Sequence, residues 1–328
     1  MTVSPVTPLP RPRREDWRLP ADALAQPARF ACGLPDERLT VTVGIPNYKR
    51  MDRLRLCLAS LAQQQGRPFK VIVSNDDPSE PVPQALIDAF ADAFAALEIY
   101  EQPRNLGLLG NAHFVLAKAR TPYFMWLAND DAVSENWIED LATLLDADAT
   151  AVGAMGQWIL ALSPTHSFLR PQICHDGRAR LPRVMNFIWR ADDAFFYGVF
   201  RREALLSGTF QGYVWPNRGF VRNWCYVFLI APLCAGRIVY SDRCRWVCDE
   251  YSAKHYPAAP SVGSKIAVLA AAAIRRVNVH LLYARNLSAC APLLVVPGFA
   301  VSLAALAREA CGFLGGSVVR RLRRQFAR

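Results

Sequence analysis

The chain has 328 residues, of which 52% are hydrophobic and 20% are charged. This composition excludes a disordered polyelectrolyte and allows one large folded domain or two of ordinary size. The 38 Lys and Arg residues outnumber the 28 Asp and Glu residues, which gives a formal charge of +10. Such a balance favours anionic partners, for example nucleotides or lipid head groups.

The first 37 residues are rich in Pro and Arg and lack an apolar run long enough for a signal sequence. We therefore expect a loosely docked lead-in over residues 1–37 and a cytoplasmic main domain. Nine cysteines are scattered along the chain, and no Cys-x-x-Cys pair occurs among them. They fit reduced thiols better than a zinc site.

Between residues 38 and 160 the sequence alternates strand and helix patterns with short connections. The expected elements, in chain order, are a strand at 39–46, a helix at 51–65, a strand at 71–73, a helix at 84–94, a strand at 97–101, a helix at 105–119, a strand at 123–127, a helix at 137–145 and a strand at 150–162. This alternation predicts an α/β fold with a mostly parallel, doubly wound sheet and right-handed crossovers.

Polar side chains follow three of the predicted strands, in Pro46-Asn47-Tyr48, Asn75-Asp76-Asp77 and Asn129-Asp130-Asp131. One such turn is ordinary, because Asn and Asp form turns and cap helices. In a parallel sheet, however, the carboxyl ends of the strands meet at one edge, where ligands bind. Two Asp pairs there would repel each other unless a cation or hydrogen-bond donors lay between them. We therefore interpret this edge as a functional site.

A carboxylate pair on a rigid strand end suits Mg²⁺ or Mn²⁺, which take oxygen ligands and share them with substrate phosphates. An Asp on a neighbouring loop can accept a hydrogen bond from a base N–H. No Gly-rich loop follows the first strand, because GIPNYKR has neither the dinucleotide-binding nor the Walker spacing. This argues against a dehydrogenase and against a P-loop enzyme.

Four segments in order, VTVGIPNYKR, VIVSNDDPS, RNLGLLGN and YFMWLANDD, resemble the nucleotide-sugar domain of inverting glycosyltransferases of family 2, which have the GT-A fold. The resemblance covers roughly residues 38–250. It implies a catalytic domain at 38–256, with a nucleotide-sugar half at 38–160 and an acceptor half at 161–256. It also implies transfer of a sugar, with inversion, from a nucleoside diphosphate sugar to a glycan or lipid-linked acceptor, assisted by Mg²⁺ or Mn²⁺.

The resemblance further implies roles for single residues. Pro46 and Tyr48 would line the base pocket, and Asp76 would bind the edge of a base, with uridine or a deoxythymidine relative preferred. The implied nucleotide-binding positions are Pro46, Tyr48, Asp76, Asn105, Gly107, Asn111, Asn129 and Asp130. The implied metal ligands are Asp131, the preferred one, and Asp130, which would reach the ribose or share the metal.

An inverting transfer needs a general base to deprotonate the acceptor hydroxyl. Where the family carries an Asp, this chain has Asn223, and an amide cannot accept a proton usefully near neutral pH. Either the base is elsewhere or the protein is catalytically weak. The candidate catalytic positions are Asp192, Asp193 and Asn223, with Asp249 and Glu250 as further possibilities for the base.

Two other function classes stay open. A nucleotidyltransferase also uses a parallel sheet with acidic metal ligands, but it would attack phosphorus and release pyrophosphate. A non-catalytic sugar-nucleotide-binding or scaffold protein would explain an Asn where a base is expected. No recognised nucleic-acid module occurs, so we expect no nucleic-acid partner.

Residues 257–328 form a helical region that is apolar and then basic. The run from Ser288 to Ala307 carries no charge and is nearly long enough to cross a bilayer. Pro292, Pro297 and Gly298 would break a single straight helix, so a hairpin or an interfacial segment is an equal alternative. The final RRLRRQFAR suits anionic lipids, and peripheral membrane contact is expected. A helix packed on the catalytic domain, or one that forms a dimer, is the other alternative.

Overall fold

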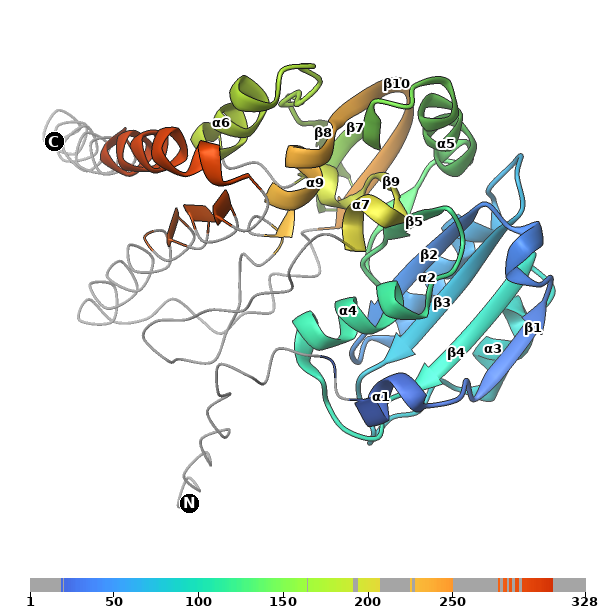
Figure 1. The fold of residues 1–328 in the computed structure, drawn as a ribbon. Helices are drawn as coiled ribbons and strands as arrows, with labels where there is room; N and C mark the ends of the chain where they lie inside the picture. The colour runs from blue at the N-terminus through green and yellow to red at the C-terminus, as the bar shows by residue number, and fades with distance from the viewer. Residues whose placement is uncertain are drawn as a thin grey trace, which may run out of the picture.

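The computed structural model describes residues 21–163, 165–190, 194–206, 228–249 and 291–308, together with Leu19, Cys225 and part of the segment 277–288. Within these residues, ten strands form one sheet in the order β1-β4-β3-β2-β5-β9-β7-β10-β6, with β8 paired to β7 (Figure 1). The strands are β1 Phe30–Gly33, β2 Val41–Asn47, β3 Phe69–Asn75, β4 Ala96–Glu101, β5 Tyr123–Trp126, β6 Ala132–Val133, β7 Ala151–Ser163, β8 His166–Leu169, β9 Val199–Arg201 and β10 Arg237–Asp249.

The sheet is mixed and mostly parallel, as the sequence predicts. Strands β4, β3, β2 and β5 pair in parallel, and so do β7 and β10. Strands β1, β6, β8 and β9 pair antiparallel. The register of β2 against β3 sets Asn47 directly opposite Asn75, at the carboxyl ends of both strands.

The sheet begins earlier in the chain than predicted. Strand β1 pairs with β4, with Phe30 opposite Ile99, and helix α1 (Ala21–Ala25) precedes it. Residues 21–37 are therefore not a loosely docked lead-in. The reason is that a four-residue edge strand needs only two inward side chains, which is too short a pattern to be visible in a sequence rich in Pro and Arg.

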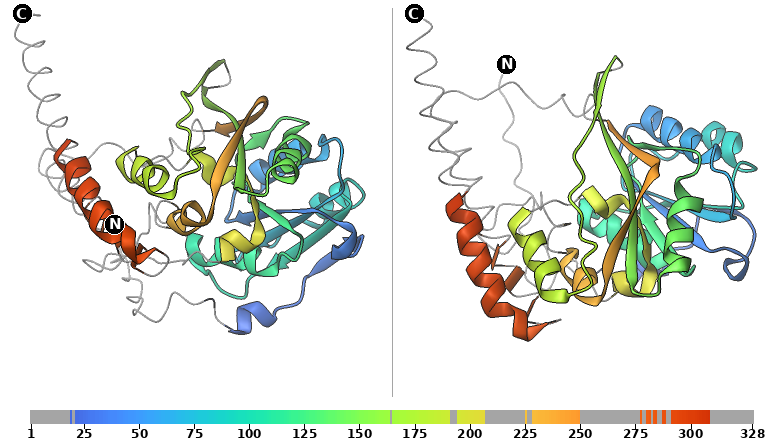
Figure 2. Two further views of the ribbon diagram at one scale, coloured as in Figure 1. Left: turned by 45° about the horizontal axis from the view of Figure 1, so that its top comes forward. Right: turned by 90° about the horizontal axis from the view of Figure 1, so that it is seen from above.

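Helices cover both faces of the parallel part of the sheet (Figure 2). Helices α2 (Met51–Ala62) and α3 (Gln84–Phe90) contact each other on one face, and α4 (Gly107–Lys118) packs on β2 and β3 from the other. In α2 the buried residues are Leu54, Cys57, Leu58 and Leu61. They are the helical face that the sequence predicts, so the local pattern decides how this helix docks.

The second half of the sheet carries its own helices. Helix α5 (Trp137–Ala147) packs on β7 and β10, and α6 (Arg180–Arg190) contacts α9 (Ile230–Ala235). The remaining short elements are η1 Asp36–Arg38, η2 Ala194–Tyr197, α7 Arg202–Leu206 and η4 Pro292–Leu294. A further helix at 295–308 lies beside α6 at the outer edge of the molecule (Figures 1 and 2).

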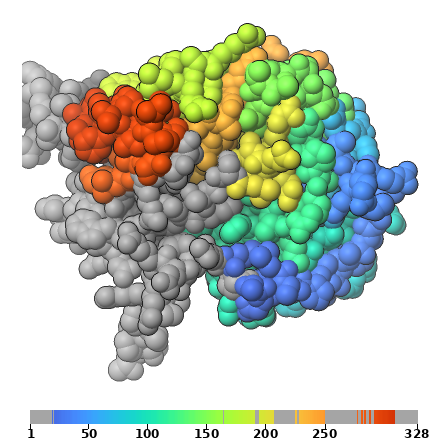
Figure 3. Space-filling model, in the orientation of Figure 1, coloured from blue at the N-terminus to red at the C-terminus, as the bar shows by residue number. Residues whose placement is uncertain are grey.

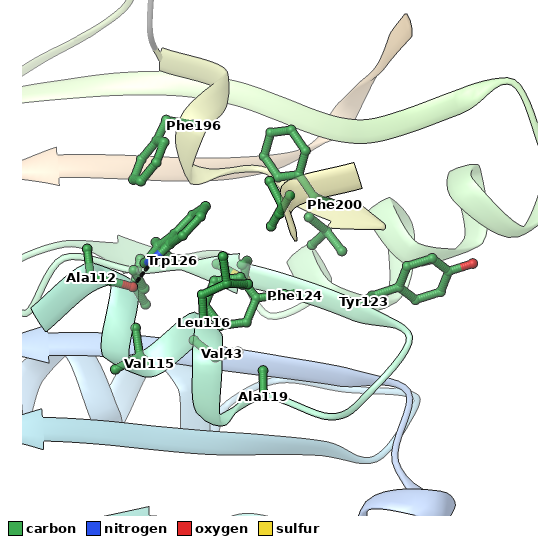
Figure 4. Close-up of a cluster of buried hydrophobic side chains, with 14 of the residues drawn as sticks. Val43, Ala112, Val115, Leu116, Ala119, Tyr123, Phe124, Trp126, Phe196 and Phe200 are labelled. Carbon is green, nitrogen blue, oxygen red and sulfur yellow. Dashed lines mark hydrogen bonds between the residues drawn. The ribbon is translucent and has the colours of Figure 1, made fainter. Parts of the chain in front are cut away.

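A single buried cluster joins the two halves (Figure 4). The indole of Trp126, at the end of β5, donates from Nε1 to the carbonyl of Ala112 in α4 at 2.9 Å. Its ring stacks on Phe196 of η2, with the ring centroids 4.4 Å apart. Trp126 therefore fixes α4 and η2 against the same strand, directly before the polar residues that follow β5.

The predicted membrane crossing at the C-terminal end has no counterpart in the described residues, where no helix is both long and apolar enough to span a bilayer. The predicted boundaries at residues 160 and 256 stay predictions. Strands from both predicted halves belong to one continuous sheet.

Candidate functional site

Three side-chain amides connect the carboxyl ends of β2, β3 and β5. Asn47 donates from Nδ2 to Oδ1 of Asn75 at 3.1 Å, and Asn129, in the loop after β5, donates to Oδ1 of Asn47 at 2.6 Å. We call these three residues, with Asp76 and Asp130, the strand-end cluster. The three predicted polar strand ends therefore meet at one edge of the sheet, and amide donors lie among the carboxylates there.

The Asn75 amide is held by groups outside the cluster. Its Nδ2 donates to Oε2 of Glu101, at the end of β4, at 2.7 Å and to the carbonyl of Glu80 at 2.8 Å. Oε1 of Glu101 accepts from the backbone N–H of Val82 and from Arg29, each at 2.9 Å. These contacts fix the orientation of the Asn75 amide within the cluster.

Asp76 is the buried carboxyl group of the cluster, with 2% of its surface exposed. Its Oδ1 accepts from the backbone N–H of Leu106 at 2.6 Å, and its own N–H donates to the carbonyl of Asn47 at 2.9 Å. Burial raises the pKa of Asp76 to about 7; the N–H groups of Leu106 and Gly107 oppose this, and the charge of Asp77 adds to it. Asp76 is thus an acceptor for a ligand N–H above neutral pH.

The loop that enters α4 holds its shape beside Asp76. Oδ1 of Asn105 accepts from the backbone N–H of Gly107 at 2.8 Å. Gly107 has a φ of +73°, in the left-handed region that favours glycine, while a Cβ there would meet no atom within 4 Å. The need for glycine is therefore conformational and not steric. Asn105 and Gly107 keep the Leu106 N–H pointed at Asp76.

Asn111, on the first turns of α4, braces β2 against β3. Its side chain is buried, and Nδ2 donates to the carbonyls of Asn47 at 3.1 Å and Ser74 at 2.9 Å. Within the described part of the chain its Oδ1 has no hydrogen-bond partner. A buried acceptor without a donor is costly, so a ligand donor at this point would be favourable.

The carboxylate of Asp130 lies beside the side chain of an arginine that follows β2 in the chain. Arg50 forms an ion pair with Oδ2 of Asp130, and both side chains are partly exposed. Arg50 and its neighbour Lys49 have φ values of 59° and 60° without being glycine. Such backbone strain costs on the order of 1–3 kcal/mol per residue and is kept where the surroundings impose it, often at functional sites.

Asp131, predicted to be the preferred metal ligand, points into the protein instead. It is 4% exposed, and its two oxygens accept from the indole Nε1 of Trp246 at 3.0 Å and from the backbone N–H of Asp249 at 3.2 Å. Burial, then the charge of Asp130, raises the pKa of Asp131 well above its usual value. Each oxygen thus has a protein donor, and Asp130 is the more accessible of the two carboxylates. The roles of Asp131 and Asp130 as metal ligands stay predictions.

Pro46 and Tyr48 flank Asn47 at the edge of the cluster. Pro46 lies in β2 opposite Ser74, and Tyr48 is 48% exposed, with Nζ of Lys49 5.2 Å from its ring centroid. An exposed ring next to the cluster is free to pack against a planar ligand. Their role in a base pocket stays a prediction.

The sequence profile described as "Glycosyl transferase family 2" matches residues 42–207, which include every residue of the strand-end cluster. This chain belongs to that family. The resemblance drawn from the four sequence segments is thereby confirmed, and the fold is that of GT-A glycosyltransferases.

Two similar proteins place this family 2 member among known structures and sequences. It is 26% identical over 143 residues to the "Teichoic acid poly(glycerol phosphate) polymerase" of Staphylococcus epidermidis, and the match covers 43% of this chain and 18% of that protein. The crystal structure of S. aureus TarS 1-349 in complex with UDP-GlcNAc matches with a TM-score of 0.52 and 17% identity, over 76% of this chain and 72% of that one. At this identity the structural match shows the fold alone.

The structure describes one of the five candidate catalytic positions of this family 2 glycosyltransferase. Asp192, Asp193, Asn223 and Glu250 lie outside the described residues. Asp249 is described, and its Oδ2 accepts from Nη1 of Arg53 at 2.9 Å. The identity of the general base therefore stays a prediction.

A metal site made of protein side chains alone is not present in the described residues, where no group of three or more His, Cys, Asp or Glu side chains could hold an ion. Mg²⁺ and Mn²⁺ sites in transferases often use one or two carboxylates and take their other ligands from substrate phosphates and water. Asp130 fits that kind of site, because its carboxylate is partly exposed and next in the chain to Asn129, whose amide belongs to the cluster.

The sequence placed Asn47 and Asn75 at the functional edge without a role of their own, and it missed two further contributors, Arg50 and Trp246. Asn47, Arg50 and Asn75 lie inside the segments that carry the family resemblance, so their position was a usable signal. Trp246 gave no such signal in the sequence, because its contact with Asp131 joins residues that are 115 positions apart.

Proposed function

We propose that this family 2 glycosyltransferase transfers a sugar from a nucleoside diphosphate sugar to a glycan or lipid-linked acceptor, with inversion at the anomeric carbon. The observation that carries the proposal is the strand-end cluster, which brings a buried acceptor, Asp76, and a partly exposed carboxylate, Asp130, to one edge of the sheet. A nucleotide base needs a hydrogen-bond acceptor such as Asp76, and a diphosphate needs a carboxylate, such as Asp130, that can hold its metal ion.

Asp76 would accept the N–H of the nucleotide base, with Tyr48 and Pro46 beside the ring. A uracil or thymine ring offers one N–H on its pairing edge, which suits a single carboxylate acceptor. The proposal that uridine is the nucleoside also draws on the UDP-GlcNAc complex of TarS, which has the same fold. The Asn111 acceptor, which is buried and without a donor, is the second point where a nucleotide hydroxyl or N–H would be favourable.

The diphosphate would lie near Asp130 and Arg50. A divalent cation, Mg²⁺ or Mn²⁺, would neutralise the leaving diphosphate, with Asp130 as its protein ligand and Asp131 supporting the loop from behind. Arg50, which neutralises Asp130 in this structure, is positioned to exchange that carboxylate for a phosphate oxygen.

Inversion requires the acceptor hydroxyl to lose its proton as its oxygen attacks the anomeric carbon opposite the diphosphate. We propose that the base is one of Asp192, Asp193, Asp249 and Glu250. Among these, Asp249 is adjacent to the cluster, because its N–H bonds Asp131 and its carboxylate holds Arg53.

The test is release of nucleoside diphosphate by the purified full chain from UDP-, TDP- and GDP-linked sugars, with Mn²⁺ and a panel of glycan and lipid-linked acceptors. We expect turnover with one donor, reduced at least a hundredfold in Asp130→Asn and unchanged in Asp88→Asn, an exposed carboxylate on α3. Pyrophosphate release from a nucleoside triphosphate would establish the nucleotidyltransferase alternative. Tight donor binding with no turnover on any acceptor would establish a non-catalytic binding protein.

A further inference from the structure

The helix at 295–308 packs on α6 through one of its faces. Arg308 donates from Nη2 to the carbonyl of Trp189 at 2.7 Å, and its guanidinium lies 4.1 Å from the centroid of that indole. A Cβ on Gly298 would meet Cδ1 of Leu287 at 2.5 Å, with Ile188 of α6 next nearest. Gly298 therefore leaves room for Leu287, and the contacts of Arg308 with Trp189 hold this face of the helix against α6, as the packing alternative raised by the sequence has it.

The opposite face of the same helix, together with η4 directly before it, is apolar and exposed. Leu293 is 91% exposed, Val296 79%, Leu303 53% and Phe299 48%. With Ala300, which is also exposed, these residues follow the three- and four-residue spacing of one helical stripe. We call them the apolar face. Figure 3 shows the helix at the surface of the molecule, clear of the strands that carry the site.

The apolar face lacks the charged residues that are usual on a protein surface in contact with water. No charged residue occurs between Ser288 and Ala307, and the first charge after that run, Arg308, is turned onto Trp189. Single exposed apolar side chains are common, but a contiguous apolar stripe marks a contact with a partner or a membrane. An apolar stripe along one side of a helix suits a contact in which the helix lies in the interface plane.

The charge pattern of the chain favours an anionic surface as the partner of the apolar face. The last nine residues contain five arginines, Arg320, Arg321, Arg323, Arg324 and Arg328, and no acidic residue. They follow the apolar face by a short stretch of chain, and the whole protein carries a formal charge of +10. An apolar helix face followed closely by a polybasic segment is the pair of signals that binds anionic bilayers, because each signal alone gives marginal affinity.

We propose that the apolar face docks on an anionic lipid bilayer, with the arginines of 320–328 on its head groups. A second copy of the chain would also cover an apolar stripe, but it would gain nothing from a like-charged basic segment beside it. This inference is independent of the proposed donor site, since none of its residues belongs to the strand-end cluster.

The experiment is flotation of the purified full chain with vesicles of phosphatidylcholine alone and with 30% phosphatidylglycerol. We expect binding to the anionic vesicles that weakens at least tenfold in Leu293→Ser/Val296→Ser/Leu303→Ser. The matched control, Leu24→Ser/Leu56→Ser, changes exposed leucines on α1 and α2 and should bind like the unmodified chain. Both variants are first shown by thermal unfolding to be folded.

A second arm tests the charge. Arg320→Gln/Arg321→Gln/Arg323→Gln/Arg324→Gln, or 0.5 M salt, should also weaken anionic binding at least tenfold, because anionic head groups attract basic residues and salt screens that attraction. Unchanged flotation of the triple Ser variant would overturn the proposal. So would equal binding to both kinds of vesicle, or a dimer that the triple Ser variant converts to a monomer without any change in flotation.

Discussion

The two halves of the sheet build their share of the site by different means. In the first half, the ends of β2, β3 and β5 are joined by hydrogen bonds between side-chain amides, such as Asn47 with Asn75 at 3.1 Å. In the second half, β7 and β10 pair in parallel, and aromatic rings stack across them and η2, with the ring centroids of Trp158 and Trp246 5.6 Å apart and those of Tyr197 and Trp246 4.4 Å apart. The first half, the polar half, gathers amides and carboxylates at the sheet edge, while the second, the aromatic half, holds the loop after β5 through Trp246.

The two systems meet at Asp131. Its hydrogen bond from Trp246 connects the loop after β5 to the aromatic stack, while the adjacent Asp130 stays at the surface with Arg50. We therefore expect the two neighbouring carboxylates to have separate tasks, with Asp131 holding the loop and Asp130 available to a ligand. This division can be tested residue by residue.

The largest effect should come from breaking the joint between the halves. Trp126→Ala removes a buried indole that contacts α4 and η2, and we expect it to lower the free energy of unfolding by about 3–5 kcal/mol. Trp126→Phe keeps part of the stacking and should cost clearly less. Denaturant unfolding of both variants checks this, and a loss below 1 kcal/mol in Trp126→Ala would mean that the halves are held elsewhere.

The next largest effect concerns how the stability of the protein depends on pH through the buried carboxyl group of Asp76. The pKa of Asp76 is about 7 in the folded protein, whereas its ordinary value is 3.8. At pH values between these two, the carboxyl group of the folded protein keeps a proton that the unfolded chain has lost. Stability therefore falls as pH rises from about 4 to about 7. We expect Asp76→Asn to lack this fall and to exceed the unmodified protein by about 2–4 kcal/mol at pH 8.

Denaturant unfolding at pH 4.5 and pH 8 measures that difference directly. The control is Asp88→Asn, on the exposed surface of α3, which should follow the unmodified protein at both pH values. If Asp76→Asn shows the same pH dependence as the control, the carboxyl group of Asp76 does not carry the raised pKa.

A smaller stability effect separates the two adjacent carboxylates. Asp131→Ala leaves the Trp246 indole and the Asp249 N–H without their acceptor, which should cost about 1–3 kcal/mol. Asp130→Ala breaks a partly exposed ion pair and should cost less than 1 kcal/mol, although it should abolish transfer. Equal stability losses in the two variants, from chemical unfolding, would contradict the division of tasks.

The smallest effect lies at the turn between α2 and β3, away from the site. Arg67 donates from Nε and Nη2 to both oxygens of Glu139, each at 3.1 Å, and lowers the pKa of Glu139 to about 2. Because the folded pKa is depressed, this stabilisation is present at neutral pH and is lost as pH falls from about 4.5 towards 2. Arg67→Met should cost about 1 kcal/mol at pH 7, since Glu139 is well exposed. Thermal unfolding at pH 7 and pH 3 should show the difference shrinking.

The sequence predicts the polar half well because its pattern is local. The strands, the helices between them and the polar residues at the strand ends each occupy a short segment, and parallel pairing alone brings those ends together. The positions of Asp76 and Asp130 follow from that rule. Which oxygen faces a ligand does not, because the burial of Asp131 depends on β10, more than a hundred positions later.

The aromatic half is less predictable for the same reason. Trp246 stacks on side chains of β7 and η2, and nothing in the spacing of Trp158, Tyr197 and Trp246 along the chain indicates that they meet. The edge strand β1 was missed because its pattern is too short. The apolar and basic character of the C-terminal end was visible, whereas the face that remains exposed after packing on α6 required the structure.

The most direct test of the central claim, that the strand-end cluster binds a nucleoside diphosphate sugar, is calorimetric titration of the full chain with UDP-GlcNAc and its TDP- and GDP-linked counterparts in the presence of Mn²⁺ at pH 8. We predict saturable binding of one donor, at least tenfold weaker in Asp76→Asn and unchanged in Asp88→Asn. Donor binding that is equally strong in Asp76→Asn, or no binding of any nucleoside diphosphate sugar, would contradict the account.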